Sequence, residues 1–251
     1  MDLVVINPNT TAAMTARIGE AAQAAASAGT HVRAVNPPDG PVSIEGYYDE
    51  AFSVPGLLRE IRRHDTLGKA AGTQPPQAYV LACFDDTGLD AARCATAAPV
   101  IGIGEAAFHL ASLVSGKFSV ITTLSRSIGA IEHNLIRYGL AARCARVRAS
   151  EVAVLDLEAP GSPAQARIDA EIAAALREDR AEAIVLGCAG MAHFAAELST
   201  RHGVPVIDGV AAAVKLAEAL VGLGLKTSKV GGYASPLPKI YLGQFADGAP
   251  R

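Results

Sequence analysis

The chain has 251 residues, half of them hydrophobic, with 19% charged residues and a formal net charge of −3. This composition is typical of a globular α/β protein and excludes disordered and fibrous classes. The weak negative charge and the absence of a Lys/Arg cluster argue against nucleic acid as a partner. No apolar run reaches membrane-spanning length, and residues 1–6 pass straight into Asn-Pro-Asn without room for a signal peptide. We therefore expect a cytoplasmic protein without a membrane partner.

Short β-branched runs alternate with long alanine-rich stretches, a pattern that predicts mostly parallel sheets flanked by helices. The predicted strands lie near residues 2–6, 31–35, 78–82, 99–103, 118–121, 151–155, 183–186 and 205–207. The predicted helices occupy residues 10–28, 49–70, 88–97, 105–115, 125–138, 162–179, 190–202 and 209–223. Thr10 or Thr11 and Ser162 are the expected capping residues, and Gly203 and Gly224 fall where helix ends favour positive φ.

One six-residue sequence motif occurs twice in the chain, and each copy ends in a cysteine. Residues 78–83 read Ala-Tyr-Val-Leu-Ala-Cys, and residues 183–188 read Ala-Ile-Val-Leu-Gly-Cys. A Pro-Val-Ile strand follows each copy, and residues 3–7 resemble residues 118–122 more loosely. An internal duplication of this kind predicts two similar lobes related by pseudo-twofold symmetry.

No Gly/Ser run or charge block separates the two halves, so we expect compact lobes rather than domains on a flexible linker. The repeat places lobe one at residues 1–97 and lobe two at residues 98–208. The proline-rich segment 209–251 should return to pack on lobe one.

Each lobe offers one thiol, Cys83 or Cys188, where an apolar strand gives way to a turn. Ligands of open α/β sheets bind outside the carboxyl ends of the strands, so both thiols should face one cleft between the lobes. Two thiols on opposite sides of a cleft can remove a proton from one face of a carbon and return it to the other face. This arrangement predicts a racemase.

The other two cysteines, Cys94 and Cys144, have no counterpart in the other lobe, and we expect them to be structural. The chain contains no C-x-x-C, and its histidines have no metal-ligand spacing, so no metal is predicted. His109 and His193 lie on predicted helices beside the motifs, and a structural role is the simpler interpretation of both.

Polar residues follow several of the predicted strands and are candidate substrate contacts. Asn7 lies in an Asn-Pro-Asn segment that could serve equally as a turn or as a ligand contact. Asp85 and Asp86 could cap the helix that starts near Gly88, or lie in the cleft. The full candidate set beside the two cysteines is Asn7, Phe84, Asp85, Thr122, Thr123, Gly187, Ala189 and Gly190.

Residues 102–107, Gly-Ile-Gly-Glu-Ala-Ala, match the G-x-G-x-x-A pattern of dinucleotide-binding proteins. That fingerprint also requires an acidic residue about twenty positions on, at the end of the next strand. Here that strand ends in Thr122-Thr123, so we predict neither a nucleotide nor any other cofactor.

These motifs resemble those of the aspartate/glutamate/hydantoin racemase superfamily, most closely its hydantoin racemase branch, which includes allantoin racemases. The matching stretches span nearly the whole chain in order: 6–11, 82–84, 88–93, 99–103, 105–107, 118–123, 187–191 and 215–220. The resemblance implies a cofactor-independent racemase in which Cys83 and Cys188 are the acid/base pair. It also implies that Asn7, Thr122 and the turn residues beside each cysteine contact the substrate, a 5-substituted hydantoin or allantoin.

The chain departs from the branch at Asp85-Asp86-Thr87, where related sequences often read Gly-Asp-Pro, and the extra carboxylate bears on the substrate. An aspartate/glutamate-type racemase and a malonate decarboxylase or isomerase are the alternatives within the fold. The alternative that is not an enzyme is a non-catalytic solute-binding protein, although such a protein would gain little from paired thiols. A cysteine hydrolase would need a histidine base, which the sequence places beside neither thiol.

The alanine-rich helices 10–28 and 162–179 carry apolar faces that one small lobe does not readily cover. The mean hydropathy of +0.26 is also high for a soluble monomer. We therefore expect a homo-oligomer in which each cleft forms within one subunit.

Overall fold

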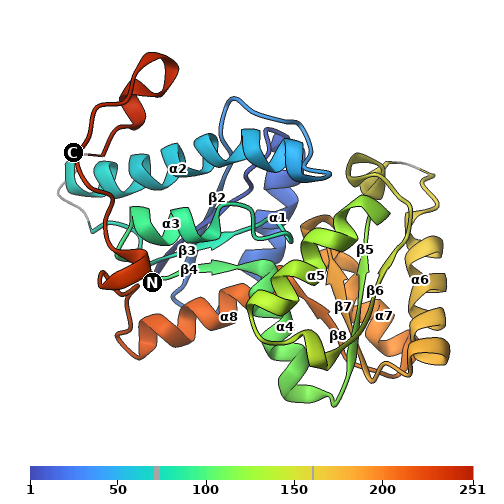
Figure 1. Cartoon of the computed structure of the whole chain (residues 1–251). Helices are drawn as coiled ribbons and strands as arrows, with labels where there is room; N and C mark the ends of the chain where they lie inside the picture. Colours follow the sequence, from blue (N-terminus) through green and yellow to red (C-terminus); the bar gives the residue numbers. More distant parts are fainter. Residues whose placement is uncertain (71–73, 160, 251) are drawn as a thin grey trace.

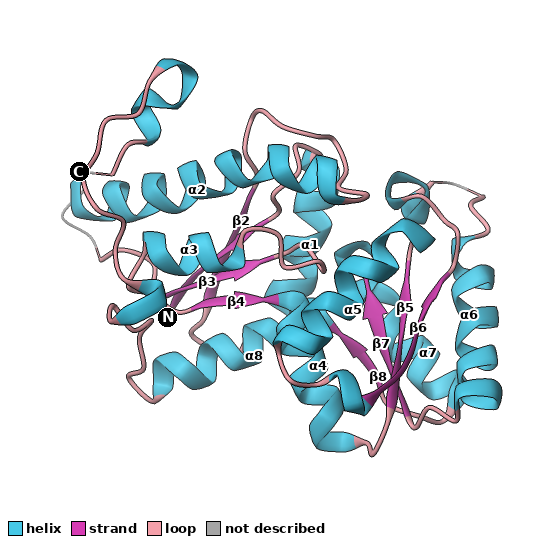
Figure 2. Ribbon diagram, in the orientation of Figure 1, coloured by secondary structure: helices cyan, strands magenta, loops and turns pink. Residues whose placement is uncertain are grey.

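The computed structural model describes residues 1–70, 74–159 and 161–250. Within them the strands form two four-stranded parallel sheets, ordered β2-β1-β3-β4 and β6-β5-β7-β8 (Figures 1 and 2). The two sheets have the same strand order, so the duplication read from the sequence is a duplication of architecture. The predicted fold class, two similar parallel α/β lobes, is confirmed.

Each sheet consists of short parallel strands, of which the two central ones are buried. The first sheet contains β1 (Asp2–Ile6), β2 (His31–Val35), β3 (Ala78–Leu81) and β4 (Val100–Gly102). The second contains β5 (Phe118–Thr122), β6 (Cys144–Ala149), β7 (Ala183–Gly187) and β8 (Val206–Asp208). The register pairs Ile6 with Leu81 and Thr122 with Gly187, so the central strands of each sheet end level with one another.

Eight helices cover the sheets in the described residues. They are α1 (Ala12–Ala25), α2 (Tyr47–Ala70), α3 (Leu89–Ala95), α4 (Ile103–Val114), α5 (Ile128–Arg137), α6 (Ala164–Ala174), α7 (Ala195–His202) and α8 (Gly209–Gly222). None of these helices combines the length and apolar character needed to cross a membrane. Tighter helical turns precede α5 at Ser125–Ser127 and α7 at Ala189–Phe194.

The helices that follow β4 and β8 join the two lobes. Helix α4 follows the first sheet but packs on β7 of the second, and α8 follows the second sheet but packs on β3 of the first. The two helices also pack against each other, so one hydrophobic cluster runs from Val5 and Val80 to Val120 and Val185 (Figure 1). The lobes therefore share a core, which fixes the position of one sheet relative to the other.

The predicted limits of the lobes need one adjustment. β4 pairs with β3, so a boundary between residues 97 and 98 would separate Val100–Gly102 from its own sheet. The segment after α8 contacts lobe one, where the Thr227 amide donates to the Ala97 carbonyl at 3.0 Å. The first sheet thus extends to Gly102.

The strand predicted at 151–155 was wrong, and the strand beside β5 is β6, at Cys144–Ala149. β6 is an edge strand in which only Val147 is fully buried, so it lacks the continuous apolar run by which the sequence marks a buried strand. Arg148 of β6 is instead held by Asp179 and Glu178. Residues 151–153 belong to a loop and Val154 begins a short 3-10 helix, Val154–Glu158, so that Val152 and Val154 are buried outside any strand.

The expected capping features hold in part. Gly203 and Gly224 have φ of 67° and 71°, as predicted for helix ends. Pro163 and not Ser162 is the N-cap of α6, although Ser162 Oγ accepts from the Ala164 amide at 3.2 Å just before the helix. Thr11 precedes α1, but its side chain forms no capping bond. The side chain of Asn9 accepts from the Thr11 amide at 2.9 Å instead.

The two glycines of the G-x-G-x-x-A match make room for a carboxylate. Asp86 Oδ1 accepts from the Gly104 amide at 3.1 Å, and Asp86 Oδ2 accepts from the Glu105 amide at 2.8 Å, so this side chain caps α4. A Cβ added at Gly102 would overlap Asp86 Oδ1, and one added at Gly104 would overlap the Phe84 carbonyl. The two glycines therefore leave space for the carboxylate of Asp86, an anion that belongs to the protein itself.

Gly102→Ala should lower the free energy of unfolding by about 2–4 kcal/mol, because the new methyl group displaces the buried cap and overpacks the core. Denaturant titration measures the loss. Gly222→Ala is the matched control, since a Cβ at that position in α8 meets no atom within 4 Å and should change stability by at most about 1 kcal/mol. Equal midpoints for Gly102→Ala and the parent protein would contradict this account of the motif.

Candidate active site

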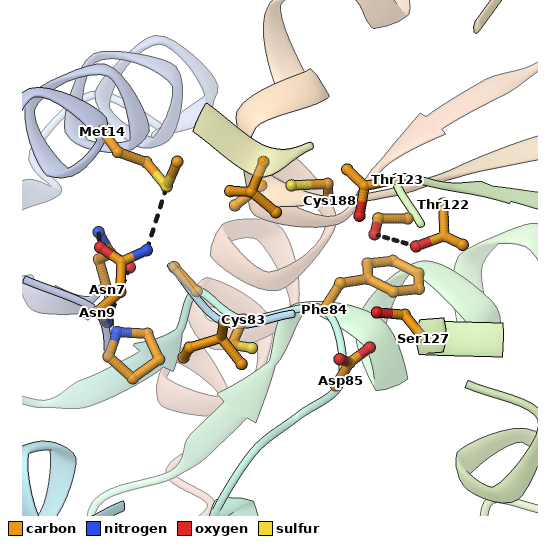
Figure 3. Close-up of a pocket in the computed structure, with 16 residues that line it drawn as sticks. Asn7, Asn9, Met14, Cys83, Phe84, Asp85, Thr122, Thr123, Ser127 and Cys188 are labelled. Carbon is orange, nitrogen blue, oxygen red and sulfur yellow. Dashed lines mark hydrogen bonds between the residues drawn. The ribbon is translucent and has the colours of Figure 1, made fainter. Parts of the chain in front are cut away.

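A pocket lies where the carboxyl ends of the two sheets face each other (Figure 3). Its walls come from the segments that follow β1, β3, β5 and β7, together with two loops. The lining residues are Asn7, Pro8, Asn9, Met14, Ile44, Ala82, Cys83, Phe84, Asp85, Thr122, Thr123, Ser127, Val154, Gly187, Cys188 and Ala189. Both repeated cysteines therefore line one pocket, formed within a single chain.

Nearly all of the residues selected from the sequence line this pocket. The set comprises both cysteines, Asn7, Phe84, Asp85, Thr122, Thr123, Gly187 and Ala189. Gly190 is not among them. A Cβ added there would lie 3.0 Å from Leu157 and 3.8 Å from Cys188 Sγ, so Gly190 leaves room behind the second thiol.

Cys83 lies in a tight turn directly after β3. The Asp86 amide donates to the Cys83 carbonyl at 3.0 Å, and Asp86 has a positive φ of 51°. Burial raises the pKa of the Cys83 thiol, and the negative charge of Asp85 raises it further. The hydroxyl of Thr87, 3.5 Å from the sulfur, lowers this pKa without offsetting the rise. Cys83 is therefore protonated at neutral pH.

Cys188 follows β7 directly and begins the tight helical turn Ala189–Phe194. The Met191 amide donates to the Cys188 carbonyl at 3.1 Å. The Thr122 hydroxyl donates to the Gly187 carbonyl at 3.2 Å, which ties the end of β5 to the residue before the thiol. A Cβ at Gly187 would lie 3.0 Å from the backbone of β5, so only glycine allows this close approach.

Asn7 organises the loop between β1 and α1. Its Nδ2 donates to Asn9 Oδ1 at 2.8 Å and to Thr15 Oγ1 at 3.0 Å. Its Oδ1 accepts from the Asn9 amide at 3.3 Å. The turn function of Asn7 is thus confirmed, and Asn7 also lines the pocket.

Asp85 brings an acidic group to the wall of the pocket. Burial raises its pKa to about 7, with further contributions from the charges of Glu50 and Asp86. Its carboxylate accepts no hydrogen bond from the residues that the structure describes, whereas its backbone carbonyl accepts from Asn134 Nδ2 at 2.7 Å. The Asp85 carboxylate is therefore available to a bound molecule.

Several residues of the site were missed by sequence reasoning. Asn134 of α5 and Tyr138, the residue that follows α5, hold the Cys83 turn, the latter through a 2.8 Å bond from its hydroxyl to Asp86 Oδ2. Ile44 reaches the pocket from a loop of one lobe and Val154 from a short 3-10 helix of the other, and the Val154 amide donates to Glu45 Oε1 at 2.9 Å across that junction. Of the missed lining residues, Pro8 and Asn9 carried a signal in the Asn-Pro-Asn segment, and Ala82 carried one in the repeated motif.

The remaining candidates lie outside the pocket. Cys94 donates to the Gly232 carbonyl at 3.4 Å, and Cys144 begins β6. His109 and His193 are both absent from its lining. Among the described residues, no three His, Cys, Asp or Glu side chains come together as a candidate metal site.

Asp85→Asn should lower the pKa of Cys83, because it removes the charge that raises this pKa most after burial. Since Asp85 itself titrates near pH 7, the variant should alkylate faster than the parent above pH 7 and at a similar rate well below it. Iodoacetamide labelling of Cys83, followed by mass spectrometry across pH, measures this. Asp2→Asn is the control, because Asp2 lies at the amino end of β1, away from the pocket. Identical pH profiles for Asp85→Asn and the parent would rule out the proposed coupling.

Comparison with known proteins identifies the family. The Asp/Glu/Hydantoin racemase model matches residues 3–217. A hydantoin racemase of Rhizobium meliloti is 52% identical, covering 97% of this chain and 98% of the relative. A hydantoin racemase of Pseudomonas sp. (strain NS671) is 46% identical, covering 97% and 95%. An allantoin racemase structure from Klebsiella pneumoniae superposes with a TM-score of 0.93 at 47% identity, covering all of both chains. The chain belongs to the Asp/Glu/hydantoin racemase family and is a racemase.

Proposed function

We propose that this racemase is cofactor-independent, that Cys83 and Cys188 are its acid/base pair, and that its substrate is a 5-substituted hydantoin or allantoin. The observation that carries the proposal is the pocket itself, which both thiols line from the ends of equivalent strands, β3 and β7. A structural role for the thiols would not require cysteine at matched positions of two lobes. The names of the similar proteins support the substrate class.

The reaction needs one thiolate and one thiol at a time. The thiolate removes the proton from the carbon next to the carbonyl, and the thiol returns a proton to the opposite face of the resulting planar carbanion. Because burial raises the pKa of Cys83, we assign the thiol form to Cys83 in the resting enzyme. Cys188 is then the base for one enantiomer, and the two cysteines exchange roles for the other enantiomer.

The carbanion is an enolate, so negative charge develops on the carbonyl oxygen and needs hydrogen-bond donors. The Thr122 hydroxyl, a predicted substrate contact, donates to the Gly187 carbonyl and thereby positions the strand before Cys188. The buried hydroxyls of Thr123 and Ser127 line the pocket and donate to none of the described residues. We assign the support of the enolate to these two hydroxyls and to the backbone amides of the turns.

The lining residues include no lysine, arginine or histidine, and they include the carboxyl group of Asp85. A neutral ring with N–H donors suits such a wall, and Asp85 can accept one of these N–H groups. A free α-carboxylate would lie near Asp85 without a cation to pair with it, at a cost in binding free energy. These features favour a cyclic ureide over an acidic amino acid.

We expect kcat/KM for a 5-substituted hydantoin or allantoin to exceed that for aspartate and glutamate by at least ~100-fold, a difference of about 3 kcal/mol. Chiral chromatography of each substrate after incubation with the enzyme measures the ratio. Comparable rates for aspartate would overturn the substrate assignment and favour the amino-acid racemase alternative, while leaving the thiol pair intact.

Cys83→Ala and Cys188→Ala should each lower racemisation by at least ~1,000-fold, because one face of the carbon loses its proton donor or acceptor. Each variant should still exchange the α-proton of one enantiomer with deuterium from solvent, since the remaining thiol still reaches one face. Proton NMR in D₂O, paired with chiral analysis, separates exchange from inversion.

Cys94→Ser is the matched control and should racemise at the parent rate, because Cys94 lies outside the pocket. Racemisation at the parent rate by either alanine variant would contradict the two-thiol mechanism.

A further inference from the structure

Two carboxyl groups at the Cys83 side of the pocket lack a hydrogen-bond donor. Asp85 lines the pocket on the same side as Cys83, across from Cys188 (Figure 3), and its carboxylate accepts no hydrogen bond from the described residues. Glu50, in the first turn of α2, has a buried Oε1 that likewise accepts no hydrogen bond there. Burying a carboxylate oxygen without a donor costs free energy, so a bound molecule that brings a donor is favoured at this place.

Glu50 lies close to the wall that Asp85 forms, although its own side chain is not part of the pocket lining. Burial raises the pKa of Asp85 to about 7, and the charge of Glu50 is the next cause of that rise. The charge of Glu50 also adds to the rise in the pKa of Cys83, after burial and the charge of Asp85. Because charges influence one another strongly only at short distance, the two carboxyl groups and the thiol form one acidic cluster.

The described residues supply no cation to this cluster. No lysine, arginine or histidine among them forms an ion pair with Asp85 or Glu50. Arg126 lies near Gly46, where an added Cβ would be 3.1 Å from Arg126 Nε, but the Arg126 side chain is exposed. The charge of the two carboxylates is therefore left to solvent or to a ligand.

The neighbouring carboxylates are engaged within the protein, unlike Asp85 and Glu50. Asp49 Oδ2 accepts from the Glu45 amide at 3.0 Å, which holds the start of α2. Asp86 caps α4 through the two bonds described above. Asp85 and Glu50 have no such structural task in the described chain, which makes them the carboxylates that can serve a substrate.

We propose that this enzyme prefers 5-substituted hydantoins whose substituent carries a cationic group, an alkylammonium or a guanidinium, and that Asp85 and Glu50 select that group. The inference rests on the proposed function, a two-thiol racemase of hydantoins. The substituent leaves the reacting carbon itself, so its first atoms lie in the pocket that Cys83 and Asp85 line. A cation there gains charge-assisted hydrogen bonds, which are stronger than those of a neutral donor.

A cation at this wall also favours the chemistry at Cys83. The charges of Asp85 and Glu50 oppose a thiolate at Cys83, and a bound cation offsets both of them. A neutral amide or ureido group can donate hydrogen bonds to the carboxylates, but it leaves their charge in place. We therefore expect the cationic substituent to raise kcat as well as to lower KM.

Racemisation of three hydantoins of similar size tests the proposal, with an aminopropyl, a carbamoylethyl or a butyl substituent. Chiral chromatography should give a kcat/KM at least ~10-fold higher for aminopropyl than for butyl, with carbamoylethyl between them. The ratio of aminopropyl to butyl should be larger above pH 7 than below it. Asp85 ionises near that pH, whereas an alkylammonium stays protonated across the range.

Equal kcat/KM for aminopropyl and butyl, or for aminopropyl and carbamoylethyl, would overturn the proposal and leave the racemase and its thiol pair in place. Failure to racemise any of the three would overturn the proposed function and this inference with it. Both outcomes are read from the parent protein, so the decision does not depend on whether a variant folds.

Variants then assign the preference to the two carboxylates. Asp85→Asn should lower the ratio of aminopropyl to butyl by at least ~10-fold, and Glu50→Gln by at least ~3-fold, because each removes a charge that the cation meets. The ratio is taken within one variant, so a general loss of activity cancels. Circular dichroism checks that each variant keeps its helical signal.

Asp156→Asn is the matched control. Asp156 is exposed on the 3-10 helix Val154–Glu158 of the other lobe, so its charge is screened by solvent and its removal should keep the parent ratio. An unchanged ratio in Asp85→Asn would overturn the assignment. An equal loss in Asp156→Asn would do the same, since it would trace the preference to the overall charge of the protein.

Discussion

The position of the first thiol depends on one buried carboxylate, that of Asp86. Asp86 is 4% exposed, and its carboxylate accepts hydrogen bonds from two backbone amides at the start of α4 and from the hydroxyl of Tyr138, which follows α5. Asp86 belongs to the same turn as Cys83. The bonds of Asp86 to the start of α4 and to Tyr138 therefore fix the position of the Cys83 thiol. A cap of this kind stabilises by about 1 kcal/mol, and removing a partner from a buried carboxylate costs several times more. The turn is therefore as rigid as the junction between the lobes.

The duplicated architecture does not give the two thiols the same surroundings. In lobe two, α8 is capped by Asp208, the last residue of β8, whose carboxylate accepts from the Val210 and Ala211 amides at 2.8 and 2.9 Å. Gly209 allows this helix to approach Ile103, since a Cβ there would lie 2.6 Å from the Ile103 carbonyl. The cap in lobe two is local, whereas the cap in lobe one comes from the cysteine turn. Only the Cys83 turn is therefore coupled to the packing of α4 and α5.

The fold could be predicted from the sequence because both sheets are buried and their central strands are continuous apolar runs with a repeat. The edge strand β6 could not, because its Arg148 is paired with Asp179 and Glu178, which are distant in sequence. The site residues that follow β1, β3, β5 and β7 could be predicted from the sequence, because the carboxyl ends of parallel strands lie at the same edge of a sheet. Tyr138 and Ile44 reach the site across the lobe junction, and no local pattern marks such residues. The glycines at 102 and 104 resembled a phosphate loop because both serve an anion, here the carboxylate of Asp86.

The acidic wall beside Cys83 gives a physical reason why a two-thiol racemase can work with a buried cysteine. In the proposed mechanism racemisation moves one negative charge from one sulfur to the other, so the pocket must tolerate that charge on either side. An ionised Asp85 opposes a thiolate at Cys83, and a protonated Asp85 does not. Because burial and the charge of Glu50 bring the pKa of Asp85 to about 7, proton uptake by Asp85 at neutral pH needs little free energy. Asp85 can therefore take up a proton as Cys83 loses one, which keeps the total charge of that side constant and brings the two thiolate states closer in free energy.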